Sequence, residues 1–429
     1  MHPIRQHAII EHRRVLTAAM AGTAVEFYDF YIYATAAALV FGPLFFPEQS
    51  PAAALALSFL TFGIAFFARP VGAIAFGHFG DRVGRKSTLV ASLLLMGLST
   101  LLIAFLPTYA MAEAWGAGWL APALLCVLRF GQGFGLGGEW GGAALLAVEN
   151  APRGWEARFG AAPQFGAPIG FLAANGLFLA LGLWLPEAEF KAWGWRVPFL
   201  LSAVLVGLGL WVRLRIGETP EFSAALAKEK PPEVPLVRLF ARHGWAVLAG
   251  TAGAVACFAI FYLATAFALA VGTGALGYSR STFLSVQLAA NCFLALGIAL
   301  AASRADLRGS RSTLALGAAA TVLLGLVFGP GLASGSLVLV FATLSAALFV
   351  MGYVYGPLGA WLPTLYPPLV RYSGVSVAFN AGGIVGGALT PFVAQGMAAS
   401  GNLIFVGGLI SLAGLLTLIG VLSARARCD

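Results

Sequence analysis

The chain has 429 residues, of which 60% are hydrophobic and only 10% are charged. Soluble domains are about a quarter charged, so this chain has too few polar groups to cover a globular surface in water. A soluble globular protein is therefore excluded, and we expect most of the outer surface to face lipid.

Apolar stretches long enough to cross a bilayer recur along the whole chain. A hydrocarbon core of about 30 Å requires roughly 20 apolar helical residues. Prolines inside these stretches, such as Pro163, Pro168, Pro357 and Pro391, predict kinked helices that pack against their neighbours. We predict an all-α membrane protein with twelve transmembrane helices, at approximately 15–46, 52–79, 88–107, 119–149, 157–184, 197–216, 245–272, 281–302, 312–330, 336–362, 372–398 and 401–423.

The 25 Lys and Arg residues are spread unevenly over the predicted loops. When the N-terminus is placed in the cytoplasm, only Lys191, Arg196 and Arg280 fall in outward-facing loops, and most of the other bases fall in inward-facing ones. Because inward loops of membrane proteins are enriched in bases, both termini are predicted to be cytoplasmic. The net charge of +8 has this origin, and no nucleic-acid partner is expected.

The longest polar stretch, GETPEFSAALAKEKPPEVPLVRLFARH, separates six predicted helices from six. Its prolines and charges are typical of a solvated linker. We predict an N-terminal six-helix bundle at 1–216, a cytoplasmic linker at 217–243 and a C-terminal six-helix bundle at 244–429.

Two loop motifs indicate an internal repeat. GHFGDRVGRK follows the second predicted helix and SRADLRGSR follows the eighth, and bases surround both motifs. Asp81 and Gly84 have the same spacing as Asp306 and Gly309. Many transporters are built from repeats of this kind.

Five ionisable residues lie deep inside predicted helices, where each charge costs about 2.5–3.5 kcal/mol on insertion. Four of them, Glu26, Asp29, Arg69 and Arg129, lie at a similar depth near the bilayer midplane. This is where substrate sites of secondary transporters are found, so we predict a polar cluster lining a central cavity. The alternative is a set of structural ion pairs, Arg129 with Glu26 or Arg69 with Asp29.

The fifth residue, Glu139, shares a polar stripe of the fourth helix with Arg129 and Gln132. Arg129 and Gln132 are spaced i, i+3, and Gln132 and Glu139 are spaced i, i+7. Glycines along the same helix allow neighbouring helices to approach closely. Gln132 is interpreted either as a brace between helices or as a substrate ligand. Glu139 lies nearer the cytoplasm and is interpreted as a gate, a structural pair or a proton carrier, alongside Glu26 and Asp29.

The C-terminal half has no ionisable residue deep in its predicted helices, so its candidates are uncharged. They are Tyr262, Gln287, Asn291, Tyr353, Tyr355 and Asn380, with aromatic core packing as the alternative role of the tyrosines. Tyr353 and Tyr355 are two residues apart, so at most one is expected to face a central cavity. The predicted substrate-binding residues are Arg69, Arg129, Gln132, Tyr28, Tyr262, Gln287, Asn291 and Tyr353.

No nucleophile–base pair, metal-ligand set or phosphate-binding loop is visible, and the four cysteines lack metal-ligand spacing. We therefore expect no enzymatic activity, no metal and no cofactor.

Six segments in order resemble the metabolite:proton symporter family of the major facilitator superfamily. They are EFYDFYIYATAAALVF, FFARPVGAIAFGHFGDRVGRK, RFGQGFGLGGEWGGAALLAVEN, WGWRVPFLLSA, RLRIGETPEF and VRYSGVSVAFNAGGIVGGALTPF. The resemblance covers essentially the whole chain. It implies two six-helix bundles that rock about a central cavity and are driven by the proton gradient. It also implies substrates that are organic acids, such as citrate, 2-oxoglutarate and shikimate, or zwitterions, such as proline and betaine.

The resemblance further implies gating residues that stabilise one access state. In this sequence they are Gly77, Asp81, Arg82, Gly84 and Arg85, with Asp306 and Gly309 in the less complete second motif. The chain departs from the family at TLYP, where Thr364 replaces the usual acidic residue. A coupling role for that carboxylate does not carry over, which favours Glu26 and Asp29 as proton carriers.

The function predicted from these features is proton-coupled uptake of a small organic acid by alternating access. The expected location is the bacterial inner membrane. The expected partners are protons and a small-molecule substrate, and the protein is expected to be a monomer. Three alternatives are kept: a proton-driven exporter, to which GAAPQFGAPIG points, a symporter of a zwitterionic solute, and a transporter-like membrane sensor.

Overall fold

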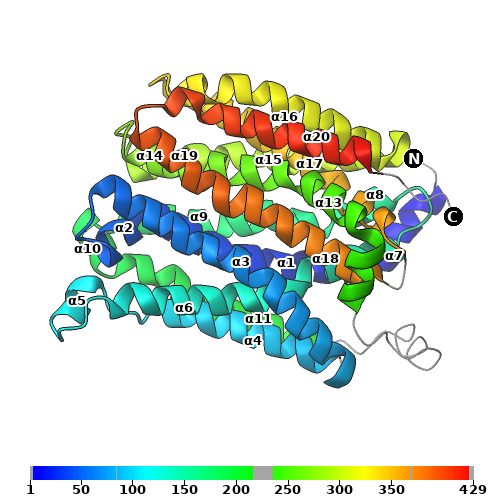
Figure 1. Cartoon of the computed structure of the whole chain (residues 1–429), viewed down its shortest axis with the longest axis horizontal. Helices are drawn as coiled ribbons and strands as arrows, with labels where there is room; N and C mark the ends of the chain where they lie inside the picture. The colour runs from blue at the N-terminus through cyan, green and yellow to red at the C-terminus, as the bar shows by residue number, and fades with distance from the viewer. Residues whose placement is uncertain (1–2, 84, 216–234, 368–369, 425–429) are drawn as a thin grey trace.

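The computed structural model describes residues 3–83, 85–215, 235–367 and 370–424, and every regular element in these ranges is helical (Figure 1). The main helices of the first half are α1 (Pro3–Ala36), α3 (Pro51–Val83), α4 (Arg85–Ile103), α6 (Leu120–Gly135), α7 (Glu139–Glu149), α8 (Glu156–Ala161), α9 (Gly166–Trp184), α10 (Glu187–Ala192) and α11 (Val197–Arg215). Those of the second half are α13 (Pro235–Tyr262), α14 (Ala268–Thr273), α15 (Arg280–Arg308), α16 (Ser310–Leu332), α17 (Leu337–Trp361), α18 (Arg371–Gly383), α19 (Thr390–Ala399) and α20 (Gly407–Ser423).

Within the described ranges, 10 helical segments are long and apolar enough to cross a membrane. Two shorter apolar helices, Val90–Ile103 and Gly194–Gly207, occupy the places of the third and sixth predicted helices. Each predicted helix therefore has a counterpart, and the prediction of an all-α, twelve-helix membrane fold is confirmed.

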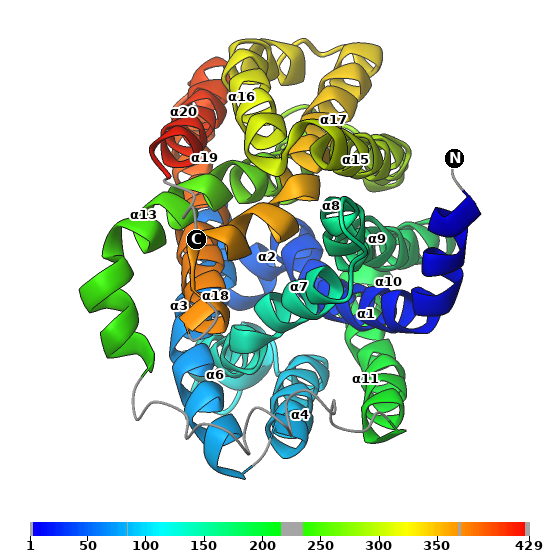
Figure 2. The same ribbon diagram turned by 90° about the vertical axis from the view of Figure 1, so that its right-hand side faces the viewer.

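The long helices run side by side along the longest axis of the molecule (Figure 1). We call the end where α1 begins and α20 ends the terminal end, and the end that carries α5 (Tyr109–Glu113) and α10 the distal end. Viewed from the terminal end, α15, α16, α17 and α20 gather on one side, and α1, α4, α6 and α11 gather on the other (Figure 2). Packing of α9 on α15 and of α3 on α18 joins the two sides.

The connection between the halves differs in detail from the predicted linker. The helix α13 begins at Pro235, inside the range that we expected to be a linker, and kinks at His243, where the backbone leaves helical geometry (φ −129°, ψ 21°). The remaining part of the predicted linker, 217–234, lies outside the described residues, so the domain boundaries stay a prediction.

Several membrane-crossing helices are irregular. A 3₁₀ turn, η2 (Leu136–Gly138), separates α6 from α7, and π-helical segments occur at η1 (Ala37–Phe41), η5 (Leu263–Phe267) and η8 (Ile384–Leu389). Such interruptions free backbone groups and are common at functional sites of helical membrane proteins.

Glycine allows α6 to lie directly against α3. A Cβ added at Gly133 would overlap the backbone of Ala65 in α3, whereas a Cβ at Gly176 in α9 would meet nothing within 4 Å. Small residues at helix contacts provide this close approach in membranes.

We expect Gly133→Ala to destabilise the folded protein by about 1–3 kcal/mol, because the added methyl group forces α6 away from α3. Gly176→Ala adds the same methyl group without a clash and serves as the matched control. Thermal unfolding of the purified protein in detergent compares the two variants. Equal midpoints for both variants would show that this contact does not limit stability.

Candidate functional site

A cavity of about 40 Å³ lies in the middle of the molecule, between the two groups of helices. We call it the central cavity. It is lined by Glu26, Phe27, Phe30, Arg69, Leu136, Gly137, Trp140, Gly141, Phe258, Tyr262, Ser376, Phe379 and Asn380. A buried water needs at least about 10–15 Å³ of such space, so this cavity has room for a few waters.

The charged groups of the central cavity are Glu26 on α1 and Arg69 on α3. The guanidinium carbon of Arg69 lies 4.3 Å from the centre of the Phe30 ring and 4.9 Å from that of Phe66. Its Nε atom is buried and makes no hydrogen bond. A guanidinium with an unused donor in an aromatic, partly dry chamber has the chemistry of a carboxylate site.

Asp29 directly precedes Phe30 in α1 but does not itself line the cavity, and it is fully buried, with 0% of its surface exposed. Its Oδ1 accepts a hydrogen bond from Ser202 on α11 at 2.5 Å, and its Oδ2 has no hydrogen-bond partner. Among the described residues, no ion pair joins Asp29 to Arg69 or Arg129. The alternative of a structural Arg69–Asp29 pair is therefore not found in this conformation.

Gln132 holds the surrounding network together. Its Nε2 donates to the carbonyl of Asp29 at 3.1 Å and to Thr100 Oγ1 at 2.9 Å, and its Oε1 accepts from Arg129. Gln132 thus links α6 to α1 and α4, and the brace interpretation describes its contacts.

Arg129 is buried behind Phe30 and does not line the central cavity. Its guanidinium carbon lies 4.3 Å from the centre of the Phe30 ring and 4.1 Å from that of Tyr33. The Phe30 ring is thus shared by Arg69 and Arg129, since both guanidinium groups contact it. In this conformation Arg69, and not Arg129, lines the central cavity.

The other predicted ligands are dispersed. Tyr262 lines the central cavity, and Gln287 lines a second, smaller pocket nearer the distal end. Tyr28 instead donates to the carbonyl of Pro198 at 2.9 Å, inside the first group of helices.

Two further predicted residues, Asn291 and Tyr353, line neither pocket. Asn291 donates to the carbonyl of Pro168 at 2.9 Å and so bridges α15 and α9. The prediction that Tyr353 faces the cavity is corrected, because its ring packs beside Phe349, and Tyr355 is the tyrosine that faces the first half. Residues two apart on a helix point in different directions, and the sequence did not indicate which of the two faces inward.

At its terminal side the central cavity is closed by stacked aromatic rings. The rings of Trp140 and Phe379 lie 3.5 Å apart and nearly parallel, and Trp140 Nε1 donates to the hydroxyl of Tyr355 at 3.0 Å. Asn380 donates to the carbonyl of Gly137 at 2.9 Å. Glu139 begins α7 in this region and is buried, but it is not among the residues that line the cavity.

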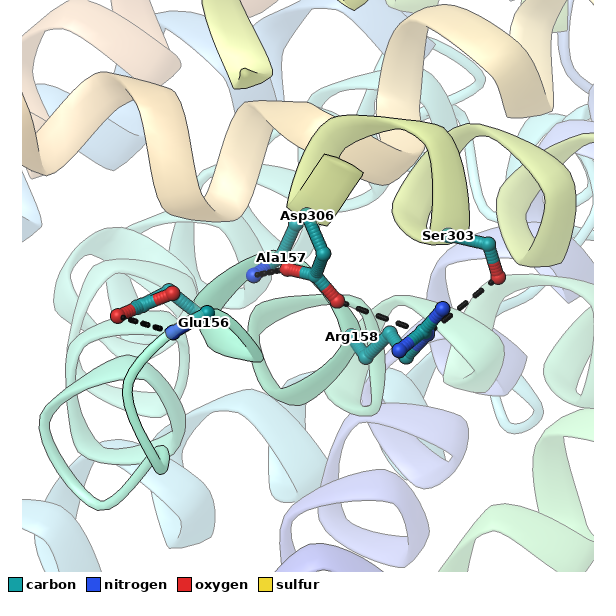
Figure 3. A network of polar contacts seen from close by, with 6 residues as sticks. Glu156, Ala157, Arg158, Ser303 and Asp306 are labelled. Carbon is teal, nitrogen blue, oxygen red and sulfur yellow. Dashed lines mark hydrogen bonds and ion pairs between the residues drawn. The ribbon is translucent and has the colours of Figure 1, made fainter. Parts of the chain in front are cut away.

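Nearer the terminal end, a polar latch joins α8 to α15 (Figure 3). Asp306 accepts a hydrogen bond from the backbone N–H of Ala157 at 2.8 Å and lies 3.5 Å from Arg158 Nε, which also contacts Ser303. Gly309 follows at the turn between α15 and α16 with φ of +88°, a conformation that favours glycine. Asp306 therefore lies where a gating residue would act.

The first gating motif cannot be placed in the same way. Gly84 itself, and the side-chain environment of Gly77, Asp81, Arg82 and Arg85, lie outside the described structure. Thr364 is exposed in the 3₁₀ turn η6 (Leu362–Leu365) that follows α17, and its hydroxyl donates to the carbonyl of Trp361 at 2.6 Å.

The distal end is closed by a separate contact between the halves. Arg280, at the start of α15, pairs with Glu187 of α10 at 2.8 Å and stacks over the Phe190 ring at 3.6 Å. Contacts between the two halves are therefore present at both ends of the molecule.

We expect Asp306→Asn to open the terminal end about fivefold more often, because it removes a partly exposed ion pair of about 1 kcal/mol. A cysteine at Ala360, which is buried beside Ala157 and Ala305, reports opening through its alkylation rate in a variant without the native cysteines. Arg311→Gln is the control, because Arg311 donates hydrogen bonds to carbonyls at the end of α20 and not to the Asp306 latch. An unchanged alkylation rate in Asp306→Asn would show that Asp306 does not hold this end closed.

This arrangement of helices around a small polar cavity defines a membrane transporter with the major facilitator fold. Residues 14–233 match the family described as "Sugar (and other) transporter". The chain belongs to this family, whose members are transporters and not enzymes.

Similar proteins agree with this assignment. The chain is 46% identical to "Inner membrane metabolite transport protein YhjE" of Escherichia coli (strain K12), over 93% of this chain and 91% of that protein. It is 37% identical to "Shikimate transporter" of the same organism, over 90% of this chain and 87% of that protein. The crystal structure of a D-xylose-proton symporter superposes with a TM-score of 0.75 at 18% identity, over 96% of this chain and 98% of that chain. At this identity the likeness concerns the fold alone.

Proposed function

We propose that this protein is a proton-coupled symporter that takes up a small organic acid. The proposal is carried by two groups: Arg69, which lines the central cavity and has an unused donor, and Asp29, a buried carboxylate for which no ion pair is found among the described residues. Ionisable groups are energetically unfavourable inside a membrane, and where they occur they mark ion and substrate pathways.

In this scheme the substrate carboxylate pairs with Arg69. A bidentate pair would use the guanidinium donors, and the rings of Phe30, Phe66 and Tyr262 would exclude water around it. Desolvation by these rings strengthens a charged hydrogen bond.

Proton binding balances the charge that the substrate brings. An anion beside Arg69 adds negative charge close to Glu26 and Asp29, and like charges at short range disfavour one another. Uptake of a proton by one of these carboxylates removes the repulsion. Phe30, which contacts both Arg69 and Arg129 and directly follows Asp29 in the chain, provides a physical connection between the two events.

The contacts between the halves at the two ends of the molecule suggest how access would alternate. Opening the Asp306 latch would expose the cavity at the terminal end, and parting Arg280 from Glu187 would expose it at the distal end. The distribution of loop charges favours a cytoplasmic position for the terminal end. With the metabolite transporters named above as relatives, we infer a bacterial inner-membrane protein that works as a monomer, with 1–216 and 244–429 as its moving halves.

Uptake by proteoliposomes tests this proposal. We expect an inward-directed proton gradient to drive accumulation of shikimate, malate or succinate, and glycine betaine to accumulate far less. Accumulation driven only by the opposite gradient would favour the exporter. Accumulation of betaine but of none of the acids would favour the zwitterion symporter. If no solute showed counterflow, the transporter-like membrane sensor would be the remaining alternative.

A further inference from the structure

A second pocket lies on the distal side of the central cavity and is lined by both groups of helices. We call it the distal pocket. Its volume is about 10 Å³, and its lining includes Tyr31, Thr35, Phe171, Asn175, Thr265 and Gln287. This space suits a single oxygen-sized group.

The distal pocket holds one unused donor and one unused acceptor. Asn175 accepts a hydrogen bond from Thr35 at 2.7 Å through Oδ1, but its Nδ2 has no partner. Gln287 donates to the carbonyls of Ala264 and Thr265 at 3.0 and 2.8 Å, but its Oε1 has no partner. Both amides are only 1% exposed, and a buried polar group without a partner costs about 1–3 kcal/mol.

The backbone fixes the orientation of Gln287. Ala264 and Thr265 belong to η5, the π-helical segment between α13 and α14. In this wider helical turn the backbone N–H of Ala268 donates to the carbonyls of Leu263 and Thr265. The amide nitrogen of Gln287 donates to the carbonyl of Ala264 and is a second donor to that of Thr265. Its oxygen is therefore held as an acceptor before any ligand arrives.

One layer of aromatic rings separates the distal pocket from the central cavity. Tyr31 stacks on Phe261 with ring centres 4.8 Å apart, and Phe261 contacts Tyr262 edge-on at 5.2 Å. Tyr31 lines the distal pocket, whereas Tyr262 lines the central cavity. A small shift of this layer would connect the two spaces.

The chemistry of the two amides selects the ligand group. A ligand that satisfies both must accept from Asn175 and donate to Gln287. A carboxylate cannot donate and an ammonium group cannot accept, but a hydroxyl group does both. We propose that the distal pocket is a hydroxyl-recognition site, which binds a hydroxyl group of a hydroxylated carboxylate whose acid group lies at Arg69. This inference rests on the proposed function and narrows its substrate class to hydroxy acids.

Calorimetric binding to the purified full-length protein tests the inference with two matched pairs of acids. Shikimate is compared with cyclohex-1-ene-1-carboxylate, and malate with succinate, since the members of each pair differ in hydroxyl groups. We expect the hydroxylated member of at least one pair to bind about 10-fold or more tightly, because its analogue leaves buried polar groups unpaired. Asn175→Leu should erase this preference while leaving the affinity for the plain acid nearly unchanged.

Gln395→Leu is the control, because Gln395 on α19 is also a buried amide with an unpartnered oxygen but lies outside both pockets. Gln287→Met is a second variant in case Asn175→Leu does not fold, as judged by thermal unfolding. Two results would overturn the inference and leave the symporter proposal standing. One is equal affinity for the two acids within both pairs. The other is a loss of affinity in Asn175→Leu that is the same for hydroxylated and plain acids. Binding of none of the four acids would overturn both.

Discussion

Asp29→Asn is expected to abolish accumulation of the acid against its gradient, while exchange of labelled for unlabelled acid continues. Asparagine can still accept the hydrogen bond from Ser202, so the fold should persist, but it cannot carry a proton. The accumulated and exchanged acid are measured in the same proteoliposomes, with and without a proton gradient. Loss of net uptake with retained exchange is the signature of a broken coupling step.

Ser202→Ala serves as the matched control for Asp29→Asn. It removes the hydrogen bond to Oδ1 but leaves the carboxylate in place. We therefore expect proton-driven accumulation of the acid to persist at a changed level. Uphill uptake by Asp29→Asn at the wild-type level would exclude Asp29 as the proton carrier and leave Glu26 as the candidate in the central cavity.

Arg69→Gln is expected to weaken binding of carboxylates by about 100-fold, because hydrogen bonds to charged groups contribute about 1.5–3 kcal/mol each. Arg69→Lys keeps the charge but loses the planar fork, so it should fall between the wild type and Arg69→Gln. The dissociation constant of the purified protein for the acid measures both effects. Arg311→Gln removes a base far from the cavity and is the control; an affinity for the acid that is equal in Arg69→Gln and the control would exclude Arg69 as the substrate ligand.

The fold could be predicted from the sequence because every segment that crosses a membrane must be a long apolar helix. The predicted run 281–302 and the observed span Arg280–Arg308 differ by a few residues, and 312–330 corresponds to Ser310–Leu332. The interruptions within these helices could not be predicted in the same way. The 3₁₀ turn at Leu136–Gly138 and the π-helix at Leu263–Phe267 arise from tertiary packing, which leaves no periodic pattern in the chain.

The site was only partly accessible. A charged residue inside an apolar helix is conspicuous, so Glu26 and Arg69 could be assigned to a cavity before the structure was known. Aromatic residues give no such signal, because most of them are ordinary core residues. Phe30, Trp140 and Phe379, which line the cavity, were therefore missed.

Helix rotation explains the remaining differences. Spacing along one helix places Arg129 and Gln132 on one face, but it does not show whether that face meets the cavity or a neighbouring helix. Arg129 in fact faces Phe30 and Tyr33, and Gln132 faces Asp29 and Thr100. Depth in the bilayer was thus a better guide than the face of the helix.

Proton uptake during binding tests the central claim most directly. Titration of shikimate or malate into the purified protein, in two buffers of different ionisation enthalpy, gives the number of protons bound with each acid. We expect about one proton per acid in the wild type and none in Asp29→Asn. Tight binding of the acid with no proton uptake by the wild type would contradict the coupling of Asp29 to Arg69.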